Sequence, residues 1–410
     1  MSNLVTNKSY WQYYKSLHFN EKCLMILYFF ALVPCSIPLL MGINTRIGIS
    51  AINPVLEIVI FIALIVLSFR VFVHELKWWD FALVIGIGWF VFWSPNIYPQ
   101  TYLAVFEFAP YFVFGCLPFY LIGASINLIR YENMFKCIGR WGLIVNIFIC
   151  ILAVLGFAQK IFGDDNNMQL AYGVLPSVIL VARNQMRHSN HIDLSLTIVG
   201  AFLILSLGCR GALLALVLYI ASDLFLFKKY KNAVSARIKI IIATMFCYLL
   251  SEPILLIMEA ITSSLGFGTR VYDKLLGGNI VNTDTRDWIY DLVSEYIAFD
   301  KEHIGYGFFY DRVLMGMEAS SYAHNIIYEL MLNFGLYIGG ALFILIISIF
   351  LMDLFKTRKN EISSLILAFF CFCFVCLFFS SSYLCNKSFW LFIGLIVTTF
   401  FKVRNKYYIK

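Results

Sequence analysis

Three residues of this chain have the chemistry of a site that acts on a phosphate: Arg210, Arg286 and His324. Each arginine offers a planar fork of N–H donors that matches phosphate oxygens. A histidine, with an unperturbed pKa near ~6.5, can accept a proton or donate a hydrogen bond to an anion. We therefore interpret the three as candidate catalytic residues, and a purely structural role is the alternative for each.

Arg286 lies in the run NTDTRDW at 282–288, which predicts the start of a helix capped by Thr283 or Asp284. Apolar residues follow at helical spacing. The first turn of this helix would place the arginine beside free backbone N–H groups, which suits the binding of a phosphate. The alternative is an ion pair of Arg286 with Asp284 or Asp287 on a solvated face.

Arg210 stands between two apolar runs, in the sequence SLGCRGA at 206–212, where there is no room for a true loop. The flanking glycines let a backbone or a ligand approach closely. We therefore favour a functional role over that of an arginine that snorkels to the headgroups. His324 and Asn325 directly precede another long apolar run, and a satisfied structural histidine is the alternative there.

The composition indicates what must position these residues. The chain has 410 residues, of which 61% are hydrophobic and 13% charged, whereas a soluble protein carries about 25% charged residues. Its repeated apolar runs are long enough to cross ~30 Å of hydrocarbon. The sequence therefore predicts an all-α polytopic membrane protein, with residues 1–410 forming a single transmembrane domain. The first 20 residues have no apolar core, so no cleavable signal peptide is expected.

The apolar runs predict about twelve transmembrane helices, with eleven or thirteen as alternatives because several runs are short. The runs are Cys23–Met41, Ala51–Val71, Trp78–Trp93, Tyr102–Ile122, Leu143–Phe157, Leu170–Ala182, Leu194–Leu207, Ala212–Phe227, Ile238–Met258, Ile326–Met352, Ser364–Phe379 and Phe389–Phe401. The segments between them carry lysine and arginine unequally: 22 lie on one set of alternate segments and 9 on the other. By the positive-inside rule both termini are cytoplasmic, and the long polar segment before the tenth span faces outward.

The net charge of +7 therefore records membrane orientation and contact with membrane lipids. No basic patch with interleaved aromatic residues appears, so a nucleic acid partner is not expected. The outward segment, Glu259–Asn325, contains ten acidic and five basic residues, so an anion site within it must be built from particular arginines. The candidate substrate contacts in this segment are Arg270, Arg312, Tyr306 and Asn325.

Four acidic residues fall inside predicted spans, three to six residues from the outer end of each helix. This places them within about 9 Å of the outer surface. Acids at such positions usually face a cavity or a partner, so the four indicate one water-filled cavity that opens outward, with Arg210 and Arg286 as cationic partners. The alternative is four independent interfacial residues. The acids are Glu57, Glu107, Glu252 and Glu329, and the last two are further candidate substrate contacts.

Over roughly residues 170–345 the chain resembles the bacterial O-antigen ligase and polymerase superfamily. The resemblance rests on the order of four short motifs together with twelve spans and one large outward loop. The motifs are Cys209-Arg210-Gly211-Ala212, Arg286-Asp287-Trp288, Gly305-Tyr306-Gly307 and His324-Asn325, the last leading into a span with Gly335 and Gly339.

The resemblance implies an inverting, metal-independent glycosyl transfer on the periplasmic face of the bacterial inner membrane. The donor would be a glycan on undecaprenyl pyrophosphate, and neither a metal nor an organic cofactor is expected. Arg210 and Arg286 match the two essential arginines of the family, and His324 matches its outward histidine. The base that activates the attacking sugar hydroxyl is left open among His324, Glu252 and Glu329.

Within the superfamily, a polymerase joins lipid-linked repeat units and a ligase transfers the glycan to the lipid A core. In the ligase pattern a glycine stands ten positions after His-Asn, and a small residue follows three positions later. Gly335 fits, but Ile338 occupies the second place, which favours a polymerase, with a chain-length regulator as a possible partner. A lipid-linked oligosaccharide flippase is the alternative of another class, although no two related halves are visible.

Overall fold

The computed structural model describes residues 10–33, 53–154, 167–188, 190–207, 209–227, 287–300, 304–317, 322–356 and 360–407, and the single positions 256 and 260. Within these ranges every regular element is helical and none is a strand, which confirms the predicted all-α class. Helices occupy all or part of each predicted apolar run except Ile238–Met258, of which only Leu256 is described.

Four of the described helices are long and apolar enough to cross a membrane, and a bent helix pair would add a fifth span. The four are Pro99–Ala124, Glu132–Ile151, Ile326–Phe355 and Glu361–Phe378, and the bent pair is Val59–Glu75 with Trp78–Asn96. These helices agree with a helical membrane protein. The number of twelve crossings stays a prediction.

The chain forms two compact units. The first consists of Met1–Glu75 and Asn127–Gly278, and the second of Leu76–Ile126 and Asn279–Lys410. Each unit therefore combines segments that are distant in the sequence.

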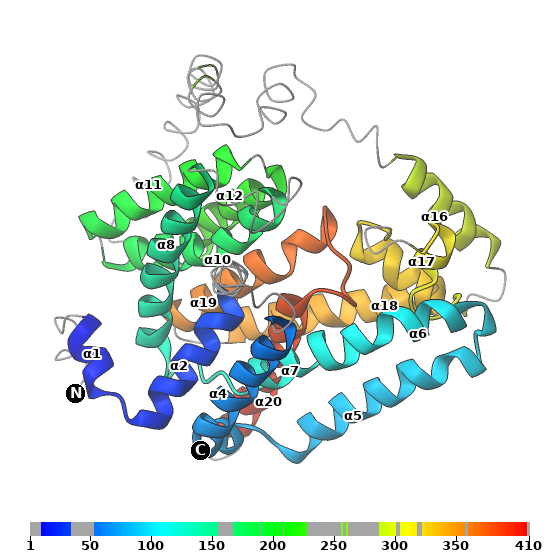
Figure 1. Ribbon diagram of the computed structural model, residues 1–410, viewed down its shortest axis with the longest axis horizontal. Coiled ribbons are helices and arrows are strands. Elements are labelled where there is room, and N and C mark those ends of the chain that lie inside the picture. The colour runs from blue at the N-terminus through cyan, green and yellow to red at the C-terminus, as the bar shows by residue number, and fades with distance from the viewer. Residues whose placement is uncertain are drawn as a thin grey trace. The chain divides into compact units, whose positions relative to one another are not determined.

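In the first unit, four successive helices pack against one another (Figure 1). They are α8 (Glu132–Val154), α10 (Asn167–His188), α11 (His191–Ser206) and α12 (Arg210–Leu226). Ion pairs join their charged ends. Arg140 Nε of α8 lies 2.5 Å from Asp193 Oδ1 of α11, and Arg187 Nη2 of α10 lies 2.8 Å from Asp223 Oδ1 of α12. Both aspartates are fully buried, so these pairs are screened little by water.

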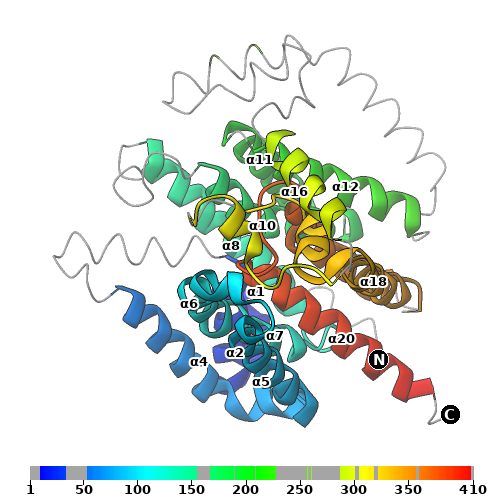
Figure 2. The same cartoon turned by 90° about the vertical axis from the view of Figure 1, so that its right-hand side faces the viewer.

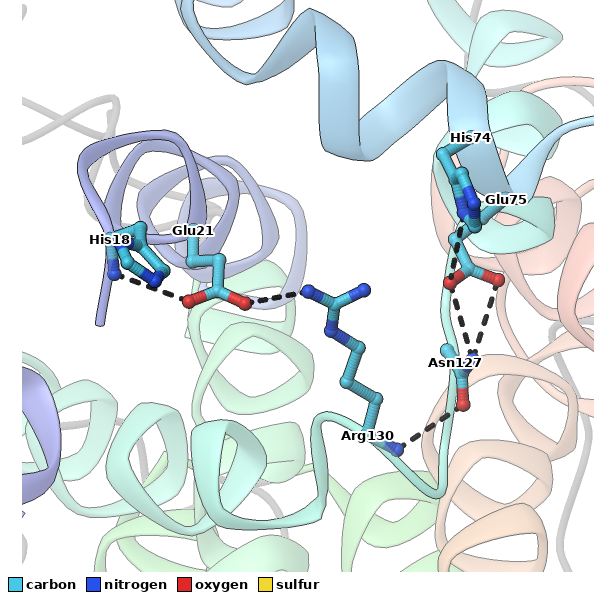
Figure 3. Close-up of polar contacts among 6 residues, drawn as sticks. All are labelled: His18, Glu21, His74, Glu75, Asn127 and Arg130. Atoms are coloured by element: carbon cyan, nitrogen blue, oxygen red, sulfur yellow. Dashed lines mark hydrogen bonds and ion pairs between the residues drawn. The ribbon is translucent and has the colours of Figure 1, made fainter. Parts of the chain in front are cut away.

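The remaining helices of this unit are α1 (Tyr10–Ser16), α2 (Phe19–Leu32) and α4 (Asn53–Glu75). The turn that precedes α8 holds α2 and α4 through polar contacts (Figure 3). Arg130 Nη2 donates to Glu21 Oε1 of α2 at 2.9 Å, and Asn127 Nδ2 donates to Glu75 Oε1 of α4 at 3.2 Å. Asn127 Oδ1 in turn accepts from the backbone N–H of Arg130. One short turn thus fixes the ends of two helices.

In the second unit, α20 packs closely against α7, as Figures 1 and 2 show. The two helices are Pro118–Ala124 and Lys387–Tyr407. A Cβ on Gly123 would overlap the backbone carbonyl of Leu391, and one on Gly394 would overlap that of Tyr120. Small residues at such crossings allow the close backbone approach that is typical of membrane helices.

The rest of this unit surrounds that crossing. Its helices are α5 (Trp78–Trp93), η2 (Ser94–Asn96), η3 (Pro99–Thr101), α6 (Tyr102–Pro110), the π-helical η4 (Tyr111–Cys116), α16 (Asp287–Phe299), α17 (Tyr310–Leu314), α18 (Ile326–Lys356), α19 (Asn360–Cys373) and η5 (Val375–Phe378). Stacked phenylalanines fill the space between α18, α19 and α20, with Phe350 and Phe370 4.1 Å apart between ring centroids. Helix α16 confirms that a helix follows Arg286, and the predicted cap, Thr283 or Asp284, lies outside the described residues.

The ion pairs of the first unit predict a contrast between two substitutions. Asp193→Ala leaves Arg140 and Asn184 without the buried carboxylate to which both donate, and should lower the unfolding free energy by about 3–5 kcal/mol. Glu21→Ala breaks the partly exposed pair with Arg130 and the bond from the His18 N–H, and should cost about 1 kcal/mol. Thermal unfolding of the purified variants in one detergent measures both. Equal losses would contradict the buried role of Asp193.

Candidate functional site

The candidate site lies in the second unit, around a break in α18. Gly335 has the non-helical dihedrals φ 80° and ψ 163° in the middle of that helix. A Cβ on Gly339 would overlap the carbonyl of Leu330, although in a straight helix the two residues lie about 13.5 Å apart along the axis. The short part of α18 before Gly335 therefore folds back against the long part after it. The sequence predicts one continuous span here and misses this break.

The break has a backbone partner. It deprives the carbonyls of Leu332 and Asn333 of their normal helical donors. The N–H of Tyr306 donates to Leu332 O at 2.9 Å, and the N–H of Gly307 donates to Asn333 O at 3.0 Å. The segment 305–307 thus completes the interrupted helix. Helix α16 also packs against α18 in this unit, as Figure 2 shows.

Both glycines of this segment are required by its geometry. Gly305 and Gly307 have positive φ angles of 78° and 92°. A Cβ on Gly305 would overlap the backbone N of Gly335, and one on Gly307 would lie 2.7 Å from Cγ of Tyr98. The structure assigns no turn to residues 304–307, and the segment instead donates its N–H groups to α18. Its role as a clamp on α18 could not be read from spacing alone.

His324 lies at the start of the short part of α18 and has a left-handed backbone, with φ 52°. This conformation costs a non-glycine residue on the order of 1–2 kcal/mol, so the surroundings must impose it. On one side Tyr322 Oη donates to Ser380 O at 2.6 Å. On the other, Asn325 Oδ1 accepts from the backbone N–H of Ile327 at 2.9 Å and caps α18. The His324 ring packs on Tyr322, with the centroids 3.9 Å apart.

Arg312 is buried, with 2% of its surface exposed. Its guanidinium lies over two aromatic rings, 4.9 Å from the centroid of Tyr322 and 5.6 Å from that of Phe108. Its Nη2 also lies 3.7 Å from Cys385 Sγ. Ring faces attract a cation, and the adjacent carboxylate of Asp311 compensates its charge. Arg312 therefore joins α17, α6 and the loop after η5.

Asp311 is fully buried as well. Its Oδ1 accepts from the backbone N–H of Arg312 at 3.0 Å, and its Oδ2 accepts from that of Ala323 at 3.3 Å. Burial raises the pKa of Asp311, and the charge of Arg312 opposes this shift. Burial likewise raises the pKa of the Cys385 thiol to about 11, again opposed by Arg312. The buried cation thus moderates the rise in pKa that burial causes in both groups.

Glu329 projects from the short part of α18 and is fully buried. Ser382 Oγ donates to its Oε1, and the backbone N–H of Tyr383 donates to its Oε2 at 3.1 Å. Asn333 Nδ2, one turn further along, donates to the hydroxyl of Tyr383 at 3.0 Å. These bonds fasten the short helix to residues 380–386. Both carboxylate oxygens of Glu329 have protein donors.

The structure brings five of the nine candidate residues into this region: Arg312, His324, Asn325, Glu329 and Tyr306. Arg210 is the half-buried first residue of α12 and belongs to the other unit. Arg270, Arg286 and Glu252 lie outside the described residues.

Of the other acids predicted to line a cavity, Glu107 is exposed on α6, in contrast to the buried Glu329. Glu57 belongs to α4 in the first unit.

Sequence reasoning missed Asp311, Tyr322, Ser382 and Tyr383. For Asp311 a signal existed, because the charged pair 311–312 stands within the apolar stretch FFYDRVL at 308–314. A pair of opposite charges in such surroundings is typical of buried positions. Ser382 and Tyr383 carry no comparable signal, since only the fold brings their loop to Glu329.

The chain matches no family model, no curated protein and no solved structure. The resemblance to the O-antigen superfamily therefore rests on the motifs alone. In the part of the chain that the structure describes, no group of three or more His, Cys, Asp or Glu residues is arranged to hold a metal ion.

The folded-back geometry of α18 predicts opposite outcomes for two neighbouring glycines. Gly339→Ala forces a methyl group into the carbonyl of Leu330 and should cost about 1–3 kcal/mol of unfolding free energy. Gly340→Ala meets only the flexible end of Met331, at 3.7 Å, and should be neutral or slightly stabilising. Thermal unfolding compares the two. A tolerated Gly339→Ala would mean that the helix is straight.

The raised pKa of Cys385 predicts slow alkylation. At pH 8 a thiol with a pKa of about 11 is roughly one part in a thousand thiolate, so reaction with iodoacetamide should be slow and should rise about tenfold per pH unit up to pH 10. Mass spectrometry of the labelled protein measures the rate, with Cys385→Ser as the control. Rapid labelling at pH 7.5 would contradict the buried, uncharged thiol.

Proposed function

We propose that this chain is an O-antigen polymerase of the bacterial inner membrane, with about twelve spans and both termini in the cytoplasm. The observation that carries the proposal is the backbone of His324, which is held in a left-handed conformation by anchors on several elements. Strained residues persist mostly where they serve a function, such as preorganising a reacting group. The side chain of His324 is partly exposed, whereas that of Glu329 is fully buried.

The proposed reaction is a single displacement at the anomeric carbon of the donor glycan. The acceptor hydroxyl loses its proton to a base, its oxygen bonds to the anomeric carbon, and undecaprenyl pyrophosphate leaves with the electrons of the old bond. Negative charge grows on the pyrophosphate as this bond breaks. Arg210 and Arg286 would stabilise that charge more in the transition state than in the ground state. This chemistry needs no proton on the leaving group.

His324 is the base in this proposal. A base needs access to the proton that it removes. Glu329, the other described candidate, is fully buried and accepts hydrogen bonds from Ser382 and Tyr383 on its two oxygens. It therefore suits a positional role, and Arg312, packed between aromatic rings, suits the same role.

Two alternatives remain distinct from a polymerase. The observation on the side of a ligase is the break at Gly335, because the ligase pattern has a glycine at this position after His-Asn. A flippase is favoured by the same break in a more general way, because interrupted helices line the binding sites of many transporters. With purified protein and lipid-linked donor, a polymerase elongates the glycan and releases undecaprenyl pyrophosphate. A flippase does neither.

Substitution of the three candidate catalytic residues tests the proposal. Arg210→Ala and Arg286→Ala, expressed at the normal level, should each lower polymerisation by about 10²–10³-fold, because a preorganised cationic contact is lost. His324→Ala should also shorten the O-antigen ladder. Lipopolysaccharide gels give the readout, and Arg130→Ala, which removes the pair with Glu21 and the contact with the Tyr131 ring in the first unit, is the control. An unchanged ladder for both arginine variants would contradict the proposal.

The gene deletion separates the two enzymes. A single repeat unit on the lipid A core is the expected result for loss of a polymerase. A core without any repeat unit would identify a ligase instead.

A further inference from the structure

We propose that Asp311 is a positioning residue for His324. Its buried carboxylate holds the backbone amide of Ala323, the residue directly before His324, and so keeps the histidine in its left-handed conformation. The importance of Asp311 for catalysis rests on the proposed function. Its hydrogen bond with the Ala323 N–H is independent of that function.

The geometry requires a carboxylate at this position. Asp311 accepts two backbone N–H groups on two different oxygens, that of Arg312 on Oδ1 and that of Ala323 on Oδ2. An amide side chain has one oxygen only and would turn its NH₂ group toward one of these donors. Asp311 and Ala323 are both fully buried, so water cannot replace a lost bond at no cost.

The element that carries Asp311 is itself fixed. α17 is entered through the left-handed Phe309, and the N–H of Arg312 also bonds Phe309 O at 3.0 Å. At its end, the N–H of Met315 donates to Asp311 O at 3.1 Å and that of Met317 to Arg312 O at 2.8 Å. The side chain of Arg312 packs between rings of two other segments. The carboxylate is therefore a stationary acceptor.

The segment that Asp311 holds needs such an acceptor. Tyr322 is fixed through its side chain to Ser380, and Asn325 through its cap on α18. The bond from the Ala323 N–H and the cap by Asn325 thus flank the strained residue directly, one on each side. Loss of this bond would let His324 relax toward an ordinary backbone conformation, which displaces its imidazole.

Asp300 offers a matched control. Its Oδ2 accepts from the backbone N–H of Gly305 at 2.8 Å, so it too holds a loop of this site through a carboxylate. The loop that it holds is the clamp on α18, however, and not the His324 segment. Asp300→Asn and Asp311→Asn are therefore the same chemical change on different loops.

The first experiment is independent of the reaction. Hydrogen–deuterium exchange on the purified chain follows the amides of residues 322–325. Asp311→Asn should speed their exchange on the order of three- to tenfold, as expected for one lost hydrogen bond, and Asp300→Asn should leave them unchanged. Unchanged exchange in Asp311→Asn, or an equal effect of Asp300→Asn, would overturn the proposal.

The second experiment is a double-mutant cycle on polymerisation by purified protein. Asp311→Asn should lower kcat on the order of tenfold with little change in KM, and should have no further effect once His324 is alanine. Asp300→Asn should act additively with His324→Ala. Additive loss for Asp311→Asn as well would overturn a role exerted through His324.

Two further outcomes have defined meanings. If Asp311→Asn does not fold, the pair Asp311→Asn with His324→Gly replaces it, because glycine adopts the left-handed backbone without strain. Recovery of folded protein supports the proposal, and continued loss of the fold overturns it. If the exchange result holds while His324→Ala polymerises normally, the proposed function fails and the structural role of Asp311 stands.

Discussion

The requirement that buried backbone groups be hydrogen-bonded governs the second unit. In a membrane protein no water is at hand to satisfy the carbonyls that a broken helix exposes. The break at Gly335 is possible because Tyr306 and Gly307 donate their N–H groups to Leu332 and Asn333. These two hydrogen bonds replace the ones that the broken helix lacks. They therefore permit the fold-back of α18, its contact at Gly339 and the position of Glu329.

The candidate site is a consequence of that arrangement. The fold-back gives α18 a short first part whose start carries His324 and Asn325 and whose inner face carries Glu329. Buried charge then ties this part to its surroundings. Asp311 and Arg312 compensate each other on α17, and Glu329 is satisfied by Ser382 and Tyr383. These buried polar groups would destabilise the fold if they had no hydrogen-bond partners. Their hydrogen bonds hold the segment that carries His324.

The two units illustrate different uses of charge. In the first, buried ion pairs such as Arg140 with Asp193 join neighbouring helices of the bundle formed by α8, α10, α11 and α12. In the second, the charged side chains converge on backbone amides and aromatic rings around one segment. The ion pairs of the first unit are explained by their contribution to stability. In the second unit, the strained backbone of His324 is the feature that suggests a role in a reaction.

The sequence by itself determined the helical membrane class, most helix positions and the residue types of the candidate site, because hydropathy and helix start signals are local properties. His324, Asn325, Glu329, Tyr306 and Arg312, all candidates from the sequence, lie in the unit that contains the break in α18. Only the tertiary structure decided that α18 breaks, that Gly305–Gly307 closes the break, and that Asp311 holds the His324 segment. Those contacts join residues up to tens of positions apart through single hydrogen bonds, and no spacing along the chain encodes them.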